Sequence, residues 1–140
     1  MVCNKKNRLF SKEELSKFNS DRAKIQNFER YRRYISLWKR GLVSGGQKEG
    51  YGKVSNHVRK YLLEKYENKC SACGWNSLNT FTNTIPLEVE HIDGNPENHS
   101  ESNLTILCPN CHSLTSNHST SKGKGRRYYR NKYMKERRDG

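Results

Sequence analysis

Apolar residues in the first third of the chain recur at intervals of three and seven, a spacing that suits the packing face of a helix. Ser11-Lys-Glu-Glu14 matches a capping box, so we predict that a helix opens there. Asn19-Ser-Asp21 is predicted to interrupt this run and to cap a second helix. The apolar positions of the face are Leu15, Phe18, Ile25, Phe28, Ile35 and Trp38.

Two different patterns follow this helical arm. Residues 41–50 are rich in glycine, which is typical of a linker. Ser55 is a suitable N-cap for a short helix that we predict to continue through Tyr66. One stripe of that helix consists of Val58, Tyr61, Leu62 and Lys65.

The middle of the chain predicts a strand, a loop, a second strand and a short helix. Residues 84–92 alternate and are rich in β-forming side chains, and residues 93–96 form a turn. Residues 104–107 are apolar enough for a second strand, and a helix carrying His112 is expected after Pro109. Helices and strands in this order place the chain in the α+β class.

The amino-acid composition limits the size of the hydrophobic core and indicates a class of binding partner. Of the 140 residues, 31% are hydrophobic, and the mean hydropathy is −1.12. A core this thin favours a structural metal in a small domain. The net charge of +13 favours a polyanionic partner, foremost nucleic acid. An anionic membrane surface is the weaker alternative, because no long apolar run is present.

Basic residues concentrate in the arm and in the tail. In the arm they alternate with the apolar face, so a solvated basic face and a phosphate-contacting face both remain open. In the tail they alternate with tyrosines, which suits backbone contacts and base stacking, and we expect the tail to become ordered on binding. The predicted nucleic-acid-binding residues are Arg30, Arg32, Arg33, Lys39, Arg40, Lys122, Lys124, Arg126, Arg127, Tyr128, Tyr129 and Arg130.

Four of the five cysteines form two Cys-x-x-Cys pairs, Cys70 with Cys73 and Cys108 with Cys111. Four thiolates arranged in this way suit one tetrahedral structural zinc ion, while an iron–sulfur cluster is the lesser alternative. Cys3 receives no role. Because no apolar secretory segment opens the chain, we expect metal binding in a reducing cytoplasm rather than disulfides.

The segments around the second cysteine pair also contain acidic, histidine and asparagine residues. The run from Leu87 to Asn95, containing Glu-His-Ile-Asp-Gly-Asn, and the run Asn103-Leu-Thr-Ile-Leu-Cys-Pro-Asn-Cys-His112 resemble the His-Asn-His (HNH) endonuclease family. The resemblance covers about residues 55–121 and is greatest to small phage and bacterial members with a Cys-Gly-Trp knuckle. It implies a ββα-metal core. We therefore expect an N-terminal arm with linker at 1–50, a nuclease domain at 51–121 and a basic tail at 122–140.

The resemblance also implies roles for individual residues. His91 would be the general base, and Asn103 would hold the loop that orients it. Glu90 and His112 would bind a catalytic Mg²⁺ or Mn²⁺. Neighbouring residues of a regular strand face opposite sides, so Glu90 and His91 share a site only where the strand bends or ends. Asp93 is predicted as a turn former, and the remaining histidines as surface or capping residues: His57, His99 and His118.

The sequence thus predicts a metal-dependent DNA endonuclease, which by resemblance would leave 5′-phosphate and 3′-hydroxyl ends. The alternative is a zinc-knuckle protein that binds DNA or RNA without cutting it. Such a protein has no need of the non-cysteine cluster, so this cluster distinguishes the two. We expect a location in the cytoplasm of a bacterial or phage-infected cell. Nicking versus double-strand cleavage is left open, as is a homodimer.

Overall fold

The computed structural model describes the backbone of residues 10–48, 50–116, 118 and 126–139, and the same side chains except those of 50, 51 and 126–132. The chain divides into two units, Met1–Tyr34 and Ile35–Gly140. The division falls inside a helix, not after the predicted linker. No helix among the described residues has the length and apolar character needed to cross a membrane.

The first helix, α1, runs without a break from Lys12 to Lys39. Its start is the predicted capping box: Ser11 N donates to Glu14 Oε2 at 2.7 Å, and Glu14 N donates to Ser11 Oγ at 3.1 Å. The predicted interruption at residues 19–21 is wrong. The helix contains no glycine or proline, so nothing removes a backbone hydrogen bond there.

The predicted linker instead contains a small antiparallel hairpin, formed by β1 (Gly46–Gln47) and β2 (Gly50–Val54). Gly45 enters it with a φ of +79°, a conformation that side chains disfavour. A Cβ on Gly45 would lie 2.5 Å from Trp38 Nε1, so the glycine also allows the tryptophan ring to pack closely. Glycine therefore serves tight packing here rather than flexibility.

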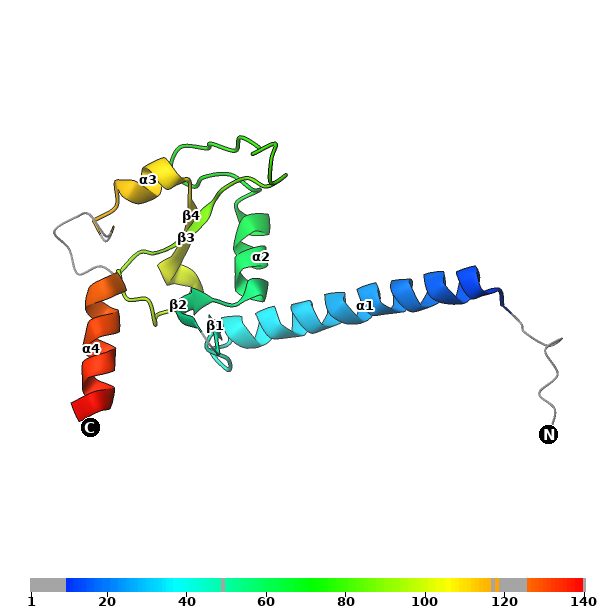
Figure 1. The fold of residues 1–140 in the computed structure, drawn as a ribbon, viewed down its shortest axis with the longest axis horizontal. Coiled ribbons are helices and arrows are strands. Elements are labelled where there is room, and N and C mark those ends of the chain that lie inside the picture. Colours follow the sequence, from blue (N-terminus) through cyan, green and yellow to red (C-terminus); the bar gives the residue numbers. More distant parts are fainter. Residues whose placement is uncertain (1–9, 49, 117, 119–125, 140) are drawn as a thin grey trace. The chain divides into compact units, whose positions relative to one another are not determined.

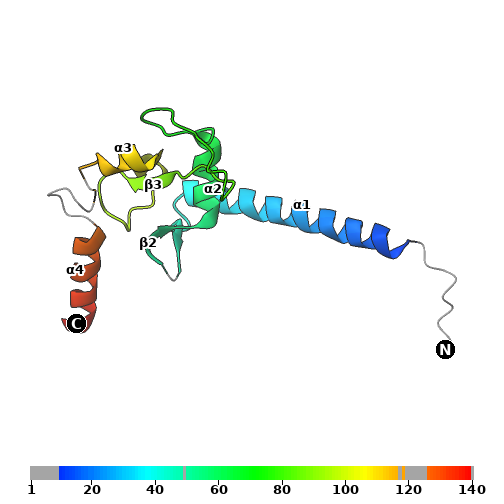
Figure 2. The same ribbon diagram turned by 45° about the horizontal axis from the view of Figure 1, so that its top comes forward.

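The second helix, α2, covers Asn56–Lys65 and begins at the predicted N-cap, where Val58 N donates to Ser55 Oγ at 3.2 Å. Val58 and Leu62 are completely buried, and with Leu104 and Ile106 they form the centre of the core. Burial of such side chains typically contributes about 1.5–3 kcal/mol each. Figures 1 and 2 show α2 on one side of the two central strands.

Those strands are β3 (Glu88–His91) and β4 (Leu104–Leu107), paired antiparallel with Glu88 opposite Leu107 and His91 opposite Leu104. The first strand is shorter than the predicted 84–92, because Pro86 has no N–H to donate to a ladder. Helix α3 (Pro109–Ser113) lies on the other side of the strands (Figure 1). The predicted order and the α+β class are confirmed.

A short 3-10 helix, η2 (Glu101–Asn103), precedes β4, and the side chain of Glu101 contacts both α1 and α2. Glu101 Oε1 accepts from Tyr61 Oη at 2.5 Å and from Lys65 Nζ at 3.1 Å. The same oxygen lies 3.8 Å from Lys39 Nζ. The hydrogen bond from Tyr61 is the largest of the effects that lower the pKa of Glu101, and the nearby lysines add to it against the opposing effect of burial. These contacts connect η2 with the C-terminal end of α1 and with α2.

The last helix, α4, covers Arg126–Asp139. This differs from the prediction that the tail gains order only on binding. The segment lacks glycine and proline and is rich in Arg and Lys, which favour helix. Lys122 and Lys124 lie outside the described residues.

Candidate metal centre and active site

The four paired cysteines lie together at the junction of the loop after α2 and the start of α3, and we call them the cysteine cluster: Cys70, Cys73, Cys108 and Cys111. Their Sγ atoms all lie within 4.8 Å of one another, and Cys73 Sγ is 3.8 Å from Cys108 Sγ. Sulfurs of a tetrahedral site with bonds of about 2.3 Å are about 3.8 Å apart. The cluster therefore fits one zinc ion, as predicted.

Backbone groups and neighbouring sulfurs set the acidity of these thiols. Burial alone would raise the pKa of Cys70, but N–H groups of Cys108, Cys73 and Ala72 outweigh it and lower the pKa to about 6. Interactions with the other sulfurs, foremost Cys108, raise the pKa of Cys111 to about 12. The neighbouring sulfurs thus oppose the ionisation of Cys111. A divalent metal supplies the positive charge that four thiolates need.

A pocket of about 560 Å³ lies beside the cluster, between the β1–β2 hairpin, β3 and the segment after β4. Its lining includes Lys53 and Arg59 together with acidic and histidine side chains. The latter set we call the acid–histidine pocket: Glu88, Glu90, His91, His112 and His118. The two central strands and α3 therefore place the predicted catalytic residues Glu90, His91 and His112 around one cavity.

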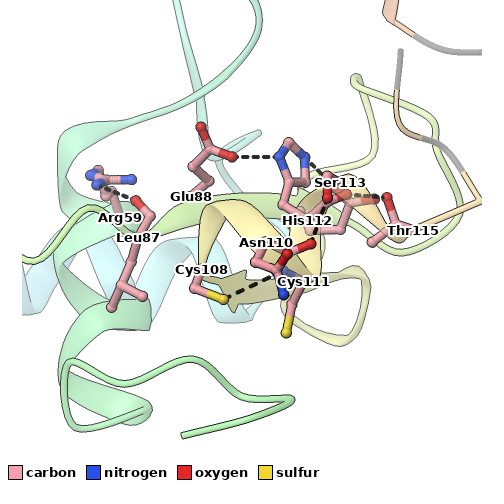
Figure 3. A network of polar contacts seen from close by, with 10 residues as sticks. Arg59, Leu87, Glu88, Cys108, Asn110, Cys111, His112, Ser113 and Thr115 are labelled. Atoms are coloured by element: carbon pink, nitrogen blue, oxygen red, sulfur yellow. Dashed lines mark hydrogen bonds and ion pairs between the residues drawn. The ribbon is translucent and has the colours of Figure 1, made fainter. Parts of the chain in front are cut away.

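His112 lies between two carboxylates of β3. Its Nδ1 is 2.5 Å from Glu88 Oε2 and its Nε2 is 2.8 Å from Glu90 Oε2. Glu88 and Glu90 are two positions apart, so strand alternation puts both on the face that meets α3. Figure 3 shows His112 reaching Glu88, while the sulfurs of Cys108 and Cys111 point the other way from α3. Sequence reasoning did not single out Glu88, although its alternation with Glu90 was a usable signal.

His91 is the last residue of β3, and its carbonyl accepts from Gly94 N at 2.9 Å. The strand therefore ends where the predicted base lies, and Glu90 and His91 both border the pocket although they are neighbours in sequence. Both side chains are buried. Neighbouring residues of a regular strand would face opposite sides, but the end of β3 at His91 allows both residues to border the same pocket.

Two histidines predicted as surface or capping residues lie against the site instead. His99 is buried, and its Nδ1 is 3.1 Å from His91 Nε2. His118 is half-buried, and its ring centroid is 5.3 Å from that of His112. The sequence spacing between His112 and His118 was misleading, because α3 ends at Ser113. By contrast, His57 lies on α2 and does not line the pocket.

Asn103 is buried and holds both ends of the loop between the strands. Its Oδ1 accepts from Asp93 N at 2.9 Å, and its Nδ2 donates to Asp93 Oδ1 and to Asn98 O, both at 2.9 Å. Asp93 in turn accepts from Asn95 N and Asn98 Nδ2 at 2.8 Å each. Partial burial would raise the pKa of Asp93, but these hydrogen bonds outweigh it and lower the pKa. The loop after His91 is thus closely specified.

The predicted nucleic-acid contacts divide into those the structure describes and those it does not. Arg30, Arg32, Arg33, Lys39 and Arg40 are all exposed on α1 or just after it. Lys39 also lies 4.3 Å above the ring centroid of Tyr61. The remaining predicted contacts lie outside the described residues or side chains: Lys122, Lys124, Arg126, Arg127, Tyr128, Tyr129 and Arg130.

Comparison with known proteins finds a similarity to an HNH endonuclease. The chain is 41% identical over 78 residues to a protein named H-N-H endonuclease F-TflIV from Escherichia phage T5. The match covers 56% of this chain but 32% of that relative, so the chain spans about a third of the relative's length. No protein-family model matches the chain. No solved structure matches it either.

Proposed function

We propose that this chain is an HNH endonuclease that hydrolyses DNA phosphodiester bonds with the help of a divalent metal. The observation that carries the proposal is one pocket bordered by a buried histidine, His91, and by a carboxylate–imidazole pair, Glu90 with His112. The similarity to an HNH endonuclease over 78 residues supports the same activity. A structural zinc site beside the pocket is consistent with it.

Glu90 and His112 have the donor atoms and the spacing for a divalent cation. Their facing atoms are 2.8 Å apart, and neighbouring ligands of an octahedral ion with bonds of about 2.1 Å are about 3 Å apart. Bound there, Mg²⁺ or Mn²⁺ would stabilise negative charge on the phosphate and on the leaving oxygen. Glu88 accepts a hydrogen bond from Nδ1 of His112. This contact would orient the ring so that Nε2, which lies beside Glu90, faces the ion.

His91 is the proposed general base. A neutral imidazole accepts a proton from water near pH 7, and the resulting hydroxide oxygen attacks phosphorus. The hydrogen bonds of Asn103 keep the loop that begins just after His91 in one conformation. By resemblance to the family, the broken bond would leave a 5′-phosphate and a 3′-hydroxyl.

Positive charge supports DNA as the substrate. Lys53 and Arg59 border the pocket, and Arg59 is held there by donating to Leu87 O at 2.8 Å. Such cations can pair with phosphates next to the cleaved one. The exposed arginines of α1 and the net charge of +13 also favour binding to the phosphates of DNA. A bacterial cytoplasm suits reduced cysteines; that location and dimerisation remain predictions.

The alternative function is a zinc-knuckle protein that binds DNA or RNA without cleavage. The cysteine cluster and the basic charge serve both functions equally. The pocket favours the enzyme, because a binding module needs no acidic pair beside a buried histidine. Acidic side chains facing a phosphate backbone would weaken binding unless a cation lay between them.

A plasmid assay separates the two functions. Supercoiled DNA is incubated with the zinc-loaded protein in Mg²⁺, in Mn²⁺ and in EDTA added briefly enough to leave the zinc in place. The proposal expects nicked or linear DNA with either metal and none with EDTA, and nicks that DNA ligase can reseal. A gel shift without cleavage in any arm would instead support the binding protein.

A further inference from the structure

The contact between His91 and His99 is the least expected polar contact at the site. The two rings are buried, with His91 Nε2 3.1 Å from His99 Nδ1 and an angle of 57° between the ring planes. At this distance one nitrogen donates its proton and the other accepts it. The direction of that hydrogen bond decides which nitrogen of His91 can act as a base.

The surroundings of His99 hold its ring in place. The backbone carbonyl of His99 accepts from Trp38 Nε1 at 2.7 Å, and this hydrogen bond connects the residue to the end of α1. A Cβ on Gly46 would lie 2.8 Å from His99 Nε2, so the hairpin backbone approaches the ring closely. A Cβ on Gly45 would lie 3.3 Å from His99 Cβ. The ring is thus enclosed by elements far away in sequence, which is typical of a specified position.

The proton balance of the proposed reaction selects one tautomer. His99 occupies Nε2 of His91, so Nδ1 of His91 must take the proton from water and must begin without one. If His91 carries its proton on Nε2, it donates to His99 Nδ1, and Nδ1 of His91 is the nitrogen that accepts. Burial lowers the pKa of His99 against a weaker opposing effect of Glu97, and this direction favours the neutral ring, which can accept a hydrogen bond.

We propose that His99 is a positioning residue that accepts a hydrogen bond from His91 Nε2 and thereby makes Nδ1 of His91 the basic nitrogen. This inference rests on the proposed function. The water proton goes to His91 Nδ1, the water oxygen bonds to phosphorus, and the bond from phosphorus to the leaving oxygen breaks. His99 neither gains nor loses a proton, and it stabilises the imidazolium that forms, as the third member of a triad does.

Two substitutions separate this role from a structural one. Asn places a side-chain oxygen near the position of Nδ1, whereas Leu fills the space without an acceptor. We expect His99→Leu to lower kcat by about tenfold to a hundredfold, less than loss of the base itself, with KM for DNA unchanged. His99→Asn should recover most of that loss. The matched control, His57→Leu, changes a histidine that does not line the pocket and should leave kcat unchanged.

Imidazole ¹⁵N NMR of the full zinc-bound chain, above the ordinary pKa of histidine, gives a readout independent of cleavage. Wild-type His91 should show the Nε2–H tautomer, and His99→Leu should lose that preference. An Nδ1–H tautomer of His91 in the wild type overturns the inference. Equal kcat values for His99→Leu and His99→Asn overturn it as well, and so does a loss of kcat that follows the loss of Tm alone. A wild-type chain that cuts no DNA overturns the proposed function itself, and with it the role of His99 in cleavage.

Discussion

The cysteine cluster and the acid–histidine pocket share α3, where Cys111 and His112 are consecutive residues, yet they differ in almost every physical property. The cluster has four identical side chains, all within 4.8 Å, supplied by two short motifs. The pocket has five side chains of two kinds around a cavity of about 560 Å³. A closed set of ligands holds a fold together, while an open, mixed set leaves room for a substrate.

Their electrostatics differ in the same sense. Sulfur neighbours oppose further ionisation of the cluster and raise the pKa of Cys111 to about 12. In the pocket the carboxylates of Glu88 and Glu90 each contact one ring nitrogen of His112, so both acids have a polar partner within the protein. The cluster therefore depends on its ion for charge balance, whereas the pocket can form without one. Substitutions in the two regions should therefore have different effects.

Loss of one cluster ligand should unfold the domain. Cys70→Ser removes a buried thiolate, and because the binding energy of a structural zinc is folding energy, we expect loss of both zinc and cooperative unfolding. Metal analysis and circular dichroism measure the two effects. The control Cys3→Ser, outside the pairs, should keep both. A Cys70→Ser protein that folds with its full zinc content would contradict the structural role of the cluster.

A pocket substitution should instead leave the fold intact and weaken the second metal. Glu88→Gln keeps the size of the side chain but weakens acceptance from His112 Nδ1. We expect Mn²⁺ affinity to fall by about tenfold to a hundredfold, towards the lower end because Glu88 is half exposed. Calorimetry on the zinc-loaded protein measures it. Glu64→Gln on α2, outside the pocket lining, is the matched control, and equal affinities for both variants would remove Glu88 from the site.

The smallest effect is expected at Glu101, an acid outside both regions. Its folded-state pKa is lowered, so its ionised form stabilises the fold above the unfolded pKa, and this contribution is lost as pH falls through the folded pKa. Glu101→Gln should cost about 1 kcal/mol at neutral pH and less in acid. Urea unfolding at several pH values tests this. A difference that stays constant with pH would show that the carboxylate charge is not responsible.

The two regions also differ in how far the sequence predicts them. The cluster was readable because two local Cys-x-x-Cys motifs leave few alternatives. The strand pair, α2 and α3 were readable because Ser55, the alternating residues near Val89 and Pro109 are local signals. The sequence did not predict the continuity of α1 or the hairpin at 46–54. Residues 19–21 can either cap a helix or lie within one, and the glycines permit more than one structure until Gly45 packs against Trp38.

Resemblance to a family indicates Glu90, His91, Asn103 and His112 as site residues, whereas His99 and His118 come into contact with His91 and His112 only through folding. His99 reaches His91 because Asn103 closes the loop on Asp93 and Asn98. His118 approaches His112 because α3 ends early. The sequence around a single histidine does not indicate these contacts, because the residue that it meets is determined by the tertiary fold.

We propose that the pocket performs hydrolysis while the cluster maintains the fold. The decisive measurement is cleavage of nicked and supercoiled plasmid under single-turnover conditions by His91→Ala, beside His57→Ala as the matched histidine control. We expect His91→Ala to cut about 10²- to 10⁴-fold more slowly than wild type, with unchanged zinc content and DNA affinity, and His57→Ala to cut at the wild-type rate. A His91→Ala protein that cuts as fast as wild type would contradict it.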